Sequence, residues 1–385
     1  MDMNTFHAGS YKQQYQYRSF SPAKVNHPWT FADPEIQTLL SEADRALGEL
    51  NAYSQLVPDV DFFIRLHITK EATQSSRIEG THTNMEEALL DEKDIDPEKR
   101  DDWVEVQNYI RAINTAIEQL ETVPLSIRLL RDTHHTLMQG ARGEHKQPGE
   151  FRNSQNWIGV SLKHAVFVPP HQDEVGELMS DLELFMQNEE IQVPHLIRIG
   201  IAHYQFETVH PFLDGNGRLG RLMIALYLAN FKLLQKPALY LSDYFERNKT
   251  AYVDNLMAVR EANDMKRWLI FFLFGIRETA RNSIKVFKNI LILKSRLESE
   301  VLPRFSSRRQ QNSQVFARQL YQTPLVSIKD VTELLNVKPN TAAALVNDFV
   351  RYGILQNLGD NKRNRLFYFA DYLAIFHNEK TDDSV

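Results

Sequence analysis

The spacing of apolar residues along the chain predicts a mainly helical protein. Apolar side chains recur at three- and four-residue steps, the period of one helix face, through most of the sequence from Asp33 to about Leu302. Asp33 is a suitable N-cap for the first helix, and Gly80 is placed to end the second, which runs from 58 to about 78. Further helices are expected over residues 104–120, 125–138, 172–187, 195–208, 221–231, 245–261 and 265–302.

Three segments depart from this helical pattern. Residues 1–32 are polar and unpatterned, which predicts a loose N-terminal arm. Between Gly140 and 170, Gly, Asn and Pro surround two β-prone pieces at 156–160 and 165–168, which predicts a β-hairpin or flap. The C-terminal portion has the rhythm of a helix-turn-helix, followed by a two-stranded wing around Gly359-Asp360-Asn361.

The expected organisation therefore has four parts. A loose arm covers residues 1–32, an N-terminal helical region covers 33–100, a helical core covers 101–302, and a winged-helix-like domain covers 303–385.

Composition excludes several protein classes. The chain has 385 residues, 43% of them hydrophobic and 24% charged, which is enough apolar material for a sizeable core. The absence of cysteine excludes disulfide scaffolds, thiolate zinc sites and cysteine nucleophiles. The net charge of −6 gives no overall attraction to nucleic acid or anionic membranes. Apolar runs fall short of the about 18 residues of a membrane span, and the N-terminus lacks the apolar core of a signal peptide, so we expect a soluble, cytoplasmic protein.

The segment from His210 to Arg221, HPFLDGNGRLGR, carries the clearest chemical signal. Gly215, Gly217 and Gly220 allow a tight turn whose N–H groups can face an anion, and the apolar run that follows continues as a helix. A glycine-rich turn that opens a helix is an anion-binding site, because its amides are exposed and the helix dipole favours negative charge.

The charged residues of this segment indicate nucleotide chemistry. Arg218 and Arg221 are three residues apart on the first helical turn and can reach the same phosphates. Asp214 is a hard oxygen ligand placed for Mg²⁺, which commonly takes one or two carboxylates together with substrate phosphates. His210, just upstream, is a candidate general base.

Two other interpretations remain open at this point. Residues 215–220 match G-x-G-x-x-G, but a dinucleotide site needs a strand before the turn, and here the preceding pattern is helical. Asp243, at the end of the strand-like LYLSD, keeps that alternative as a minor one. His210 alone would be a core or capping histidine; His203 lies two turns away on the same face, but nothing else completes a metal site.

The segment resembles the Fic motif, H-x-F-x-D/E-G-N-G-R-x-x-R, at all eight fixed positions. Upstream, the run from Ser75 to Gly80 resembles the inhibitory S/T-x-x-x-E-G/N motif of that family, and the hairpin at 149–169 resembles its substrate flap. The resemblance extends from about residue 33 to the C-terminus. It implies a Fic-type helical core with a β-hairpin flap, plus a C-terminal winged helix-turn-helix domain.

The resemblance implies a protein adenylyltransferase, which moves AMP from ATP onto a Ser, Thr or Tyr hydroxyl of a protein and releases pyrophosphate. His210 would deprotonate the hydroxyl, Asp214 would hold Mg²⁺, and Arg218 and Arg221 would bind the β- and γ-phosphates. Phe212 would pack the turn into the core. The nucleotide-binding set implied in addition is Gly215, Asn216, Gly217, Leu219 and Gly220, with Arg247, Asn248 and Tyr252 as candidates for the nucleoside, although a surface helix face explains these last three equally well.

The resemblance also implies regulation and target docking. Ser75 and Glu79 are four residues apart, on one helix that ends near Gly80, and the glutamate would pair with Arg221 and deny it to the γ-phosphate. The flap residues Val166, Phe167 and Val168 would align a target by strand addition, which uses backbone and leaves the target unnamed.

The C-terminal domain admits two roles. Its presumed reading helix, 340–352, has Arg351 as its only cation, whereas Lys362, Arg363 and Arg365 of the wing could reach DNA phosphates. Protein contact or homodimerisation is favoured over DNA binding. The alternative for the whole chain is a transcriptional regulator that senses a nucleotide and binds DNA through the winged helix.

Overall fold

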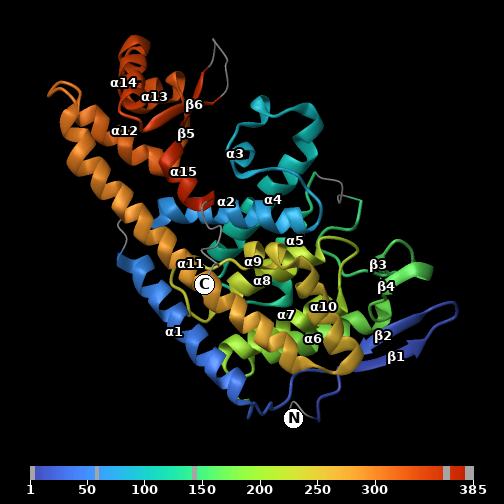
Figure 1. The fold of residues 1–385 in the computed structure, drawn as a ribbon. Helices are drawn as coiled ribbons and strands as arrows, with labels where there is room; N and C mark the ends of the chain where they lie inside the picture. Colours follow the sequence, from blue (N-terminus) through green and yellow to red (C-terminus); the bar gives the residue numbers. More distant parts are fainter. Residues whose placement is uncertain (1–4, 57–59, 141–144, 359–364, 378–385) are drawn as a thin grey trace. The chain divides into compact units, whose positions relative to one another are not determined.

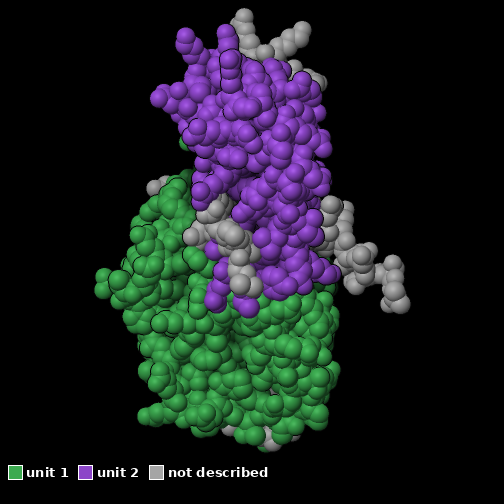
Figure 2. Space-filling model, turned by 90° about the vertical axis from the view of Figure 1, so that its left-hand side faces the viewer, with its two compact units in different colours: residues 1–51, 68–281 green, residues 52–67, 282–385 purple. Residues whose placement is uncertain are grey.

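The computed structural model describes residues 5–56, 60–140, 145–358 and 365–377. The chain forms two compact units, one from residues 1–51 and 68–281 and the other from 52–67 and 282–385 (Figure 2). The division falls inside the helices α1 (Pro34–Leu56), α2 (Val60–Ile78) and α11 (Met265–Arg296), so each of these contributes residues to both units.

The first unit is mainly helical, which confirms the fold class expected from the apolar spacing (Figure 1). Its central helix is α7 (His195–Val209), in which every residue from Leu196 to Val209 is buried. The indole of Trp268 in α11 donates to the carbonyl of Gly200 in α7 at 2.8 Å. The other helices of this unit are α3 (Met85–Ala88), α4 (Arg100–Gln119), α5 (Ile127–Leu137), α6 (Gln172–Gln187), α8 (Asn216–Asn230), α9 (Ser242–Arg247) and α10 (Lys249–Ala262), with short 3-10 turns at Glu92–Asp94, Pro97–Lys99 and Leu162–His164.

Two of the expected helices are divided. The one expected over 245–261 is α9 followed by α10, and it breaks at Asn248, whose side-chain amide donates to the carbonyl of Tyr244 at 2.9 Å. The one expected over 265–302 is α11, which continues as a π-helix at Leu297–Val301 and a 3-10 turn at Leu302–Arg304. Pro303 lies in that turn and has no N–H with which to extend an α-helix.

The N-terminal segment differs from the loose arm expected there. Strands β1 (Gly9–Gln13) and β2 (Arg18–Pro22) form an antiparallel hairpin, and Phe6, Phe20 and Trp29 are buried. The indole of Trp29 donates to the carbonyl of Val25 at 3.0 Å. A few well-spaced aromatic side chains therefore order a segment whose average composition is polar.

The flap follows the expectation. Strands β3 (Ile158–Gly159) and β4 (Ala165–Phe167) pair antiparallel, with an irregular register beside Gly159. No helix in the described part of the chain is long and apolar enough to cross a membrane.

The second unit contains α12 (Gln310–Gln322), β5 (Leu325–Ser327), α13 (Ile328–Leu335), α14 (Pro339–Arg351), β6 (Leu355–Leu358), β7 (Leu366–Phe369) and α15 (Ala370–His377). The three strands form an antiparallel sheet in the order β5-β7-β6. The helices expected for the helix-turn-helix are α13 and α14, separated by residues 336–338, of which Asn336 has φ 49°. Gly359, Asp360, Asn361, Lys362 and Arg363 lie outside the described residues.

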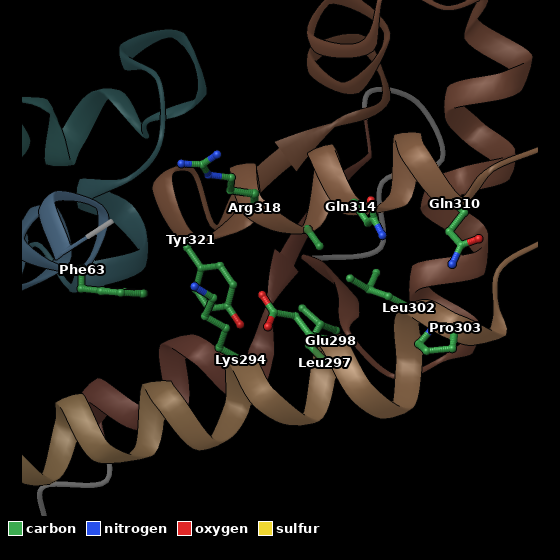
Figure 3. A pocket seen from close by; sticks show the side chains of 11 residues that line it. Phe63, Lys294, Leu297, Glu298, Leu302, Pro303, Gln310, Gln314, Arg318 and Tyr321 are labelled. Carbon is green, nitrogen blue, oxygen red and sulfur yellow. The ribbon is translucent and has the colours of Figure 1, made fainter. Parts of the chain in front are cut away.

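A cavity of about 530 Å³ lies within the second unit, lined by residues of α11, α12 and the π-helix between them (Figure 3). Tyr321 and Glu298 point toward each other across it, and the Tyr321 hydroxyl, in a side chain that is 5% exposed, has no hydrogen-bond partner among the described residues. Burial, followed by the negative charge of Glu298, raises the pKa of Tyr321. The cavity thus combines a lining of apolar, polar and charged side chains with one unsatisfied hydroxyl group.

The close crossing of α7 and α11 generates a stability prediction. A Cβ on Gly200 would lie 2.9 Å from Phe272 Cδ1 and 3.1 Å from Leu269 Cδ2. Gly200→Ala should therefore lower the free energy of unfolding by about 1–3 kcal/mol, as overpacked cores do. The matched control is Gly48→Ala on the exposed side of α1, where an added Cβ meets no atom within 4 Å and should raise stability by about 0.5–1 kcal/mol. Urea unfolding followed by circular dichroism measures both changes. If the two substitutions changed the free energy of unfolding equally, the close crossing of α7 and α11 would be contradicted.

Candidate functional site

His210 is held at the end of α7 in an uncommon backbone conformation. Its φ and ψ of 48° and 61° lie in the left-handed region, which few non-glycine residues occupy. Side chains from the segment that leads into the flap stabilise it: Arg152 Nε donates to the His210 carbonyl at 2.9 Å, and Asn156 Nδ2 donates to the Phe212 carbonyl at 2.9 Å. Neither Arg152 nor Asn156 carried a signal in the sequence, because both act on backbone groups more than fifty residues away.

The imidazole of His210 is neutral near pH 7. Burial, followed by the positive charges of Arg260 and Arg152, lowers the pKa of His210 to about 4. Its Nδ1 is buried and has no hydrogen-bond partner in the described ranges. A neutral imidazole is the form that accepts a proton.

The N-terminus of α8 presents backbone amides directly after His210. Gly215 is its N-cap with φ 73°, and a Cβ there would lie 2.6 Å from Met138 Sδ, so glycine is required. The side chain of Asn216 binds both backbone groups of Phe212, at 2.9 and 2.8 Å, and closes the turn. Asn216 therefore offers a ligand its backbone N–H, which, like that of Gly217, has no partner within the helix.

Asp214 is the exposed carboxylate of this turn, and its Oδ1 accepts from the Gly215 N–H at 2.6 Å. In the part of the chain that the structure describes, no group of three or more His, Asp or Glu residues could hold a metal ion. A single carboxylate suits Mg²⁺, which takes its other ligands from phosphate and water.

His134 in α5 packs against the turn that precedes α8 and stabilises it. Its Nδ1 accepts from the Gly149 N–H at 2.8 Å, so Nε2 carries the proton and donates to the Asp214 carbonyl at 2.9 Å. Its ring stacks on Phe212 with centroids 3.8 Å apart, and burial lowers the pKa of His134 to about 4. No pattern in the sequence indicates a role for His134.

The two arginines of α8 already have partners. Arg221 Nε donates to Ser75 Oγ at 2.9 Å, and its Nη2 donates to the Ser75 carbonyl at 2.9 Å and to Glu79 Oε1 at 2.7 Å. Arg218 Nη1 pairs with Glu105 of α4 at 3.2 Å, a residue that the sequence did not indicate. The Nε of Arg218 is buried without a partner among the described residues.

Glu79 lies in the turn just after α2, one residue beyond the helix on which it was expected. The chain still turns helically there, since the N–H of Glu79 donates to the Ser76 carbonyl at 3.0 Å, and Gly80 has φ 104°. Burial raises the pKa of Glu79, but Arg221 opposes it and the resulting pKa is below the ordinary value. The Arg221 side chain is 2% exposed and that of Glu79 is 40% exposed, so the pair borders on solvent from the Glu79 side.

A second carboxylate faces Arg221 from α7. Glu207 lies one turn before His210, is buried, and its Oε1 has no hydrogen-bond partner among the described residues. Burial raises the pKa of Glu207 to about 7, although Arg221 opposes the shift. A Cβ on Gly220 would lie 2.3 Å from this Oε1, so Gly220 makes room for the carboxylate.

The three residues named as candidates for binding the nucleoside do not lie together on one exposed surface. Arg247 is exposed and paired with Asp243 at 2.9 Å, and Asn248 is exposed at the break between α9 and α10. Tyr252 is 5% exposed and its hydroxyl binds His203 Nε2 at 2.8 Å, so it is a core side chain. The dinucleotide alternative is wrong, because the element before the glycine-rich turn is the helix α7.

Of the three flap residues expected to align a target, one is exposed. The side chain of Val166 is 64% exposed, whereas Phe167 and Val168 are buried. The Phe167 ring packs 3.9 Å from the guanidinium of Arg260, which also donates to the Glu207 carbonyl at 3.1 Å. The flap strand is thus anchored to the last turn of α7.

Comparison with known proteins shows that the segment carrying the glycine-rich turn is similar to Fic/DOC proteins. The family "Fic/DOC family" matches residues 124–228, and "Fic/DOC family N-terminal" matches residues 37–118. Protein adenylyltransferase Fic of Drosophila erecta is 29% identical over 119 residues, which is 30% of this chain and 21% of that protein. Protein adenylyltransferase fic-1 of Caenorhabditis elegans is 28% identical over 120 residues, 31% of this chain and 22% of that protein. The matched segment therefore spans about a fifth of these curated relatives.

Among solved structures, a Fic family protein from Desulfovibrio desulfuricans G20 is similar in fold. Its TM-score is 0.57 at 21% sequence identity, over 89% of this chain and 98% of that chain.

The buried Glu207 generates a prediction for stability against pH. Its folded-state pKa of about 7 exceeds the ordinary 4.5, so between these pH values the folded state retains a proton that the unfolded state has lost. Stability therefore falls as the pH rises from 4.5 to about 7 and levels off above that. Glu207→Gln mimics the protonated form at every pH. It should match the wild type near pH 4.5 and exceed it at pH 8, by an amount on the order of 3 kcal/mol. Urea unfolding at both pH values measures the difference, and a pH-independent difference would contradict the assignment.

Proposed function

We propose, from the Fic/DOC domain that this chain carries behind a Fic/DOC N-terminal region, that the protein transfers AMP from ATP to a Ser, Thr or Tyr hydroxyl of a target protein. The observation that carries the proposal is the juxtaposition between the end of α7 and the start of α8: a neutral His210, an exposed Asp214 and available backbone amides within eight residues of the chain. The names of the similar proteins support the reaction class.

Each residue then has a chemical task. The target hydroxyl oxygen attacks the α-phosphorus, the bond from that phosphorus to the pyrophosphate oxygen breaks, and His210 accepts the hydroxyl proton at Nε2, because its Nδ1 is enclosed. The amides of Asn216 and Gly217 bind the transferred phosphoryl oxygens. Asp214 contributes a carboxylate to Mg²⁺, which when bound neutralises phosphate charge.

The arginines bind the remaining phosphates. Arg218 keeps its ion pair with Glu105. Its Nε, which has no partner among the described residues, is the group that donates to the phosphates. Arg221 serves the γ-phosphate when Glu79 no longer holds it. At the nucleoside end, the exposed Arg247 and Asn248 are the remaining candidates, with Tyr252 packed in the core.

Glu79 inhibits the reaction by occupying Arg221. The guanidinium donates three hydrogen bonds to Ser75 and Glu79. A γ-phosphate therefore has to displace the Glu79 carboxylate from the Arg221 side chain, which is 2% exposed. Gly217 permits this contact, since a Cβ there would lie 2.4 Å from Glu79 Oε1. Ser75 fixes the orientation of the Arg221 guanidinium for whichever anion binds it, the Glu79 carboxylate or the γ-phosphate.

For the C-terminal unit we infer a winged helix used for protein contact, including homodimerisation, rather than for DNA. The order β5, α13, α14, β6, β7 supports the winged helix. Arg351 of α14 is paired with Asp348 at 2.6 Å, and the guanidinium of Arg365 lies over the Phe367 ring, 5.4 Å from its centroid. A mobility shift with random duplexes separates this role from a DNA-binding regulator.

His210→Ala should lower AMP transfer by about 10²–10⁴-fold while leaving ATP binding in place, because the loss of a general base has this typical effect. Incorporation of labelled AMP in the Glu79→Gly background measures the rate, and calorimetry measures ATP binding. His82→Ala, at an exposed histidine outside the site, is the control. Undiminished incorporation would remove His210 from the mechanism.

Glu79→Gly should raise incorporation of AMP from labelled ATP and Mg²⁺ by at least about tenfold, the effect of 1.4 kcal/mol at the barrier. Arg221→Ala should lower it, and the double variant should lose the gain, because the freed arginine is what activation uses. Mass spectrometry of the products locates the modified residues and tests the transferase itself.

Glu121→Gly is the matched control for this cycle, because Glu121 also lies in a turn after a long helix, α4. It should leave incorporation unchanged. If Glu79→Gly is no faster than wild type while transfer is detected, the inhibitory role fails and the transferase stands. If no variant incorporates AMP, the transferase fails.

A further inference from the structure

The N-terminal hairpin lies against the flap. The N–H of Phe20 in β2 donates to the Val168 carbonyl at 2.9 Å, and the Tyr17 hydroxyl donates to Gln155 Oε1 at 3.3 Å. The rings of Phe20 and Phe167 are 5.9 Å apart. Figure 1 shows β1–β2 and β3–β4 side by side, projecting in the same direction from the first unit. The two hairpins therefore form one continuous surface beside His210.

This surface concentrates exposed apolar side chains. The tip residues Tyr15 and Val160 are 96% and 93% exposed. Large apolar groups exposed together mark interaction sites in soluble proteins. The exposed apolar residues on the two hairpins are Tyr11, Tyr15, Trp157, Ile158, Val160 and Val166.

The two hairpin segments contribute no carboxylate of their own to this surface, which Glu174 of α6 borders through Lys12 and Ser21. Residues 5–22 and 151–170 contain no Asp or Glu, in a chain that has 50 of them and a net charge of −6. Arg18 and Lys163 are exposed there, and Lys12 is paired with Glu174 of α6 at 2.7 Å. A cationic, apolar patch on an acidic protein complements an acidic, apolar partner.

The backbone sets the direction in which such a partner can lie. Residues 165 and 167 of β4 pair with β3, whereas the carbonyl of Val168 faces the opposite edge and meets Phe20. Alternate residues of an extended strand direct their backbone groups to the same side, so Val166 faces that edge too. A strand added along Val166 therefore runs into the N-terminal hairpin.

We propose that the hairpin β1–β2 and the flap together form the docking surface for the target, and that it accepts an extended segment in which apolar residues and Asp or Glu flank the hydroxyl residue. The inference rests on the proposed function and names the class of target that it takes. Apolar side chains of the segment pack on the exposed residues of both hairpins, and its carboxylates face Arg18 and Lys163.

Direct binding tests this without requiring AMP transfer. The probes are two fluorescein-labelled peptides of equal length, each with a central Thr and alternating Val, one carrying Glu and the other Lys at the remaining positions. Anisotropy titrations with the full chain should show the Glu peptide binding at least about tenfold more tightly, and its affinity should fall as salt rises.

Surface variants locate the site. Arg18→Glu should weaken binding of the Glu peptide by about fivefold or more, since it turns an attractive charge into a repulsive one. Arg128→Glu is the matched control, because its side chain is 88% exposed on α5. Tyr15→Ser should also weaken binding, and Val253→Ser, at a 43% exposed apolar residue of α10, should not.

The outcomes distinguish this inference from the proposed function. Equal binding of the Glu and Lys peptides, or equal effects of Arg18→Glu and Arg128→Glu, overturns the docking surface even if AMP transfer occurs. Selective binding that Arg18→Glu and Tyr15→Ser abolish supports it, even if the Glu79→Gly protein transfers no AMP.

Discussion

The structure of the site depends on the buried guanidinium of Arg221. Its charge cannot be removed by losing a proton, so its burial requires anions or carbonyls around it. Ser75 and Glu79 satisfy it from the end of α2, and Glu207 faces it from α7. Because an anion is always required there, any second anion that approaches Arg221 has to displace the carboxylate of Glu79. The proposed inhibition and the proposed binding of a substrate phosphate would both follow from this one electrostatic requirement.

The glycines of the motif serve two different purposes. Gly215 has φ 73° and forms the turn, as its place before a helix indicates. Gly217 and Gly220 have ordinary helical geometry, and their missing Cβ atoms leave space for the carboxylates of Glu79 and Glu207. Sequence spacing predicts the turn, because turn formation is local. It does not predict the contacts, because the carboxylates come from other helices.

The same distinction explains how much could be predicted elsewhere. The helices and the flap follow from local periodicity and turn residues, and their bounds are close to those observed. Glu105, His134 and Arg152 could not be found, because each acts on a group distant in sequence. The N-terminal hairpin was missed for a related reason: Phe20 is buried against Phe167 of the flap, a contact that composition averages do not reveal. Sequence likewise does not reveal that Tyr252, named as a nucleoside candidate from the resemblance, is buried with its hydroxyl bonded to His203, because His203 lies on another helix.

Arg152 joins parts of the chain that otherwise have separate tasks. Its guanidinium donates to the carbonyl of His210 at 2.9 Å and to that of Pro170, at the base of the flap, at 2.5 Å. The base of the flap and the backbone of His210 are therefore tied to one rigid planar group. A displacement of the flap strand is transmitted through two hydrogen bonds to the residue that ends α7.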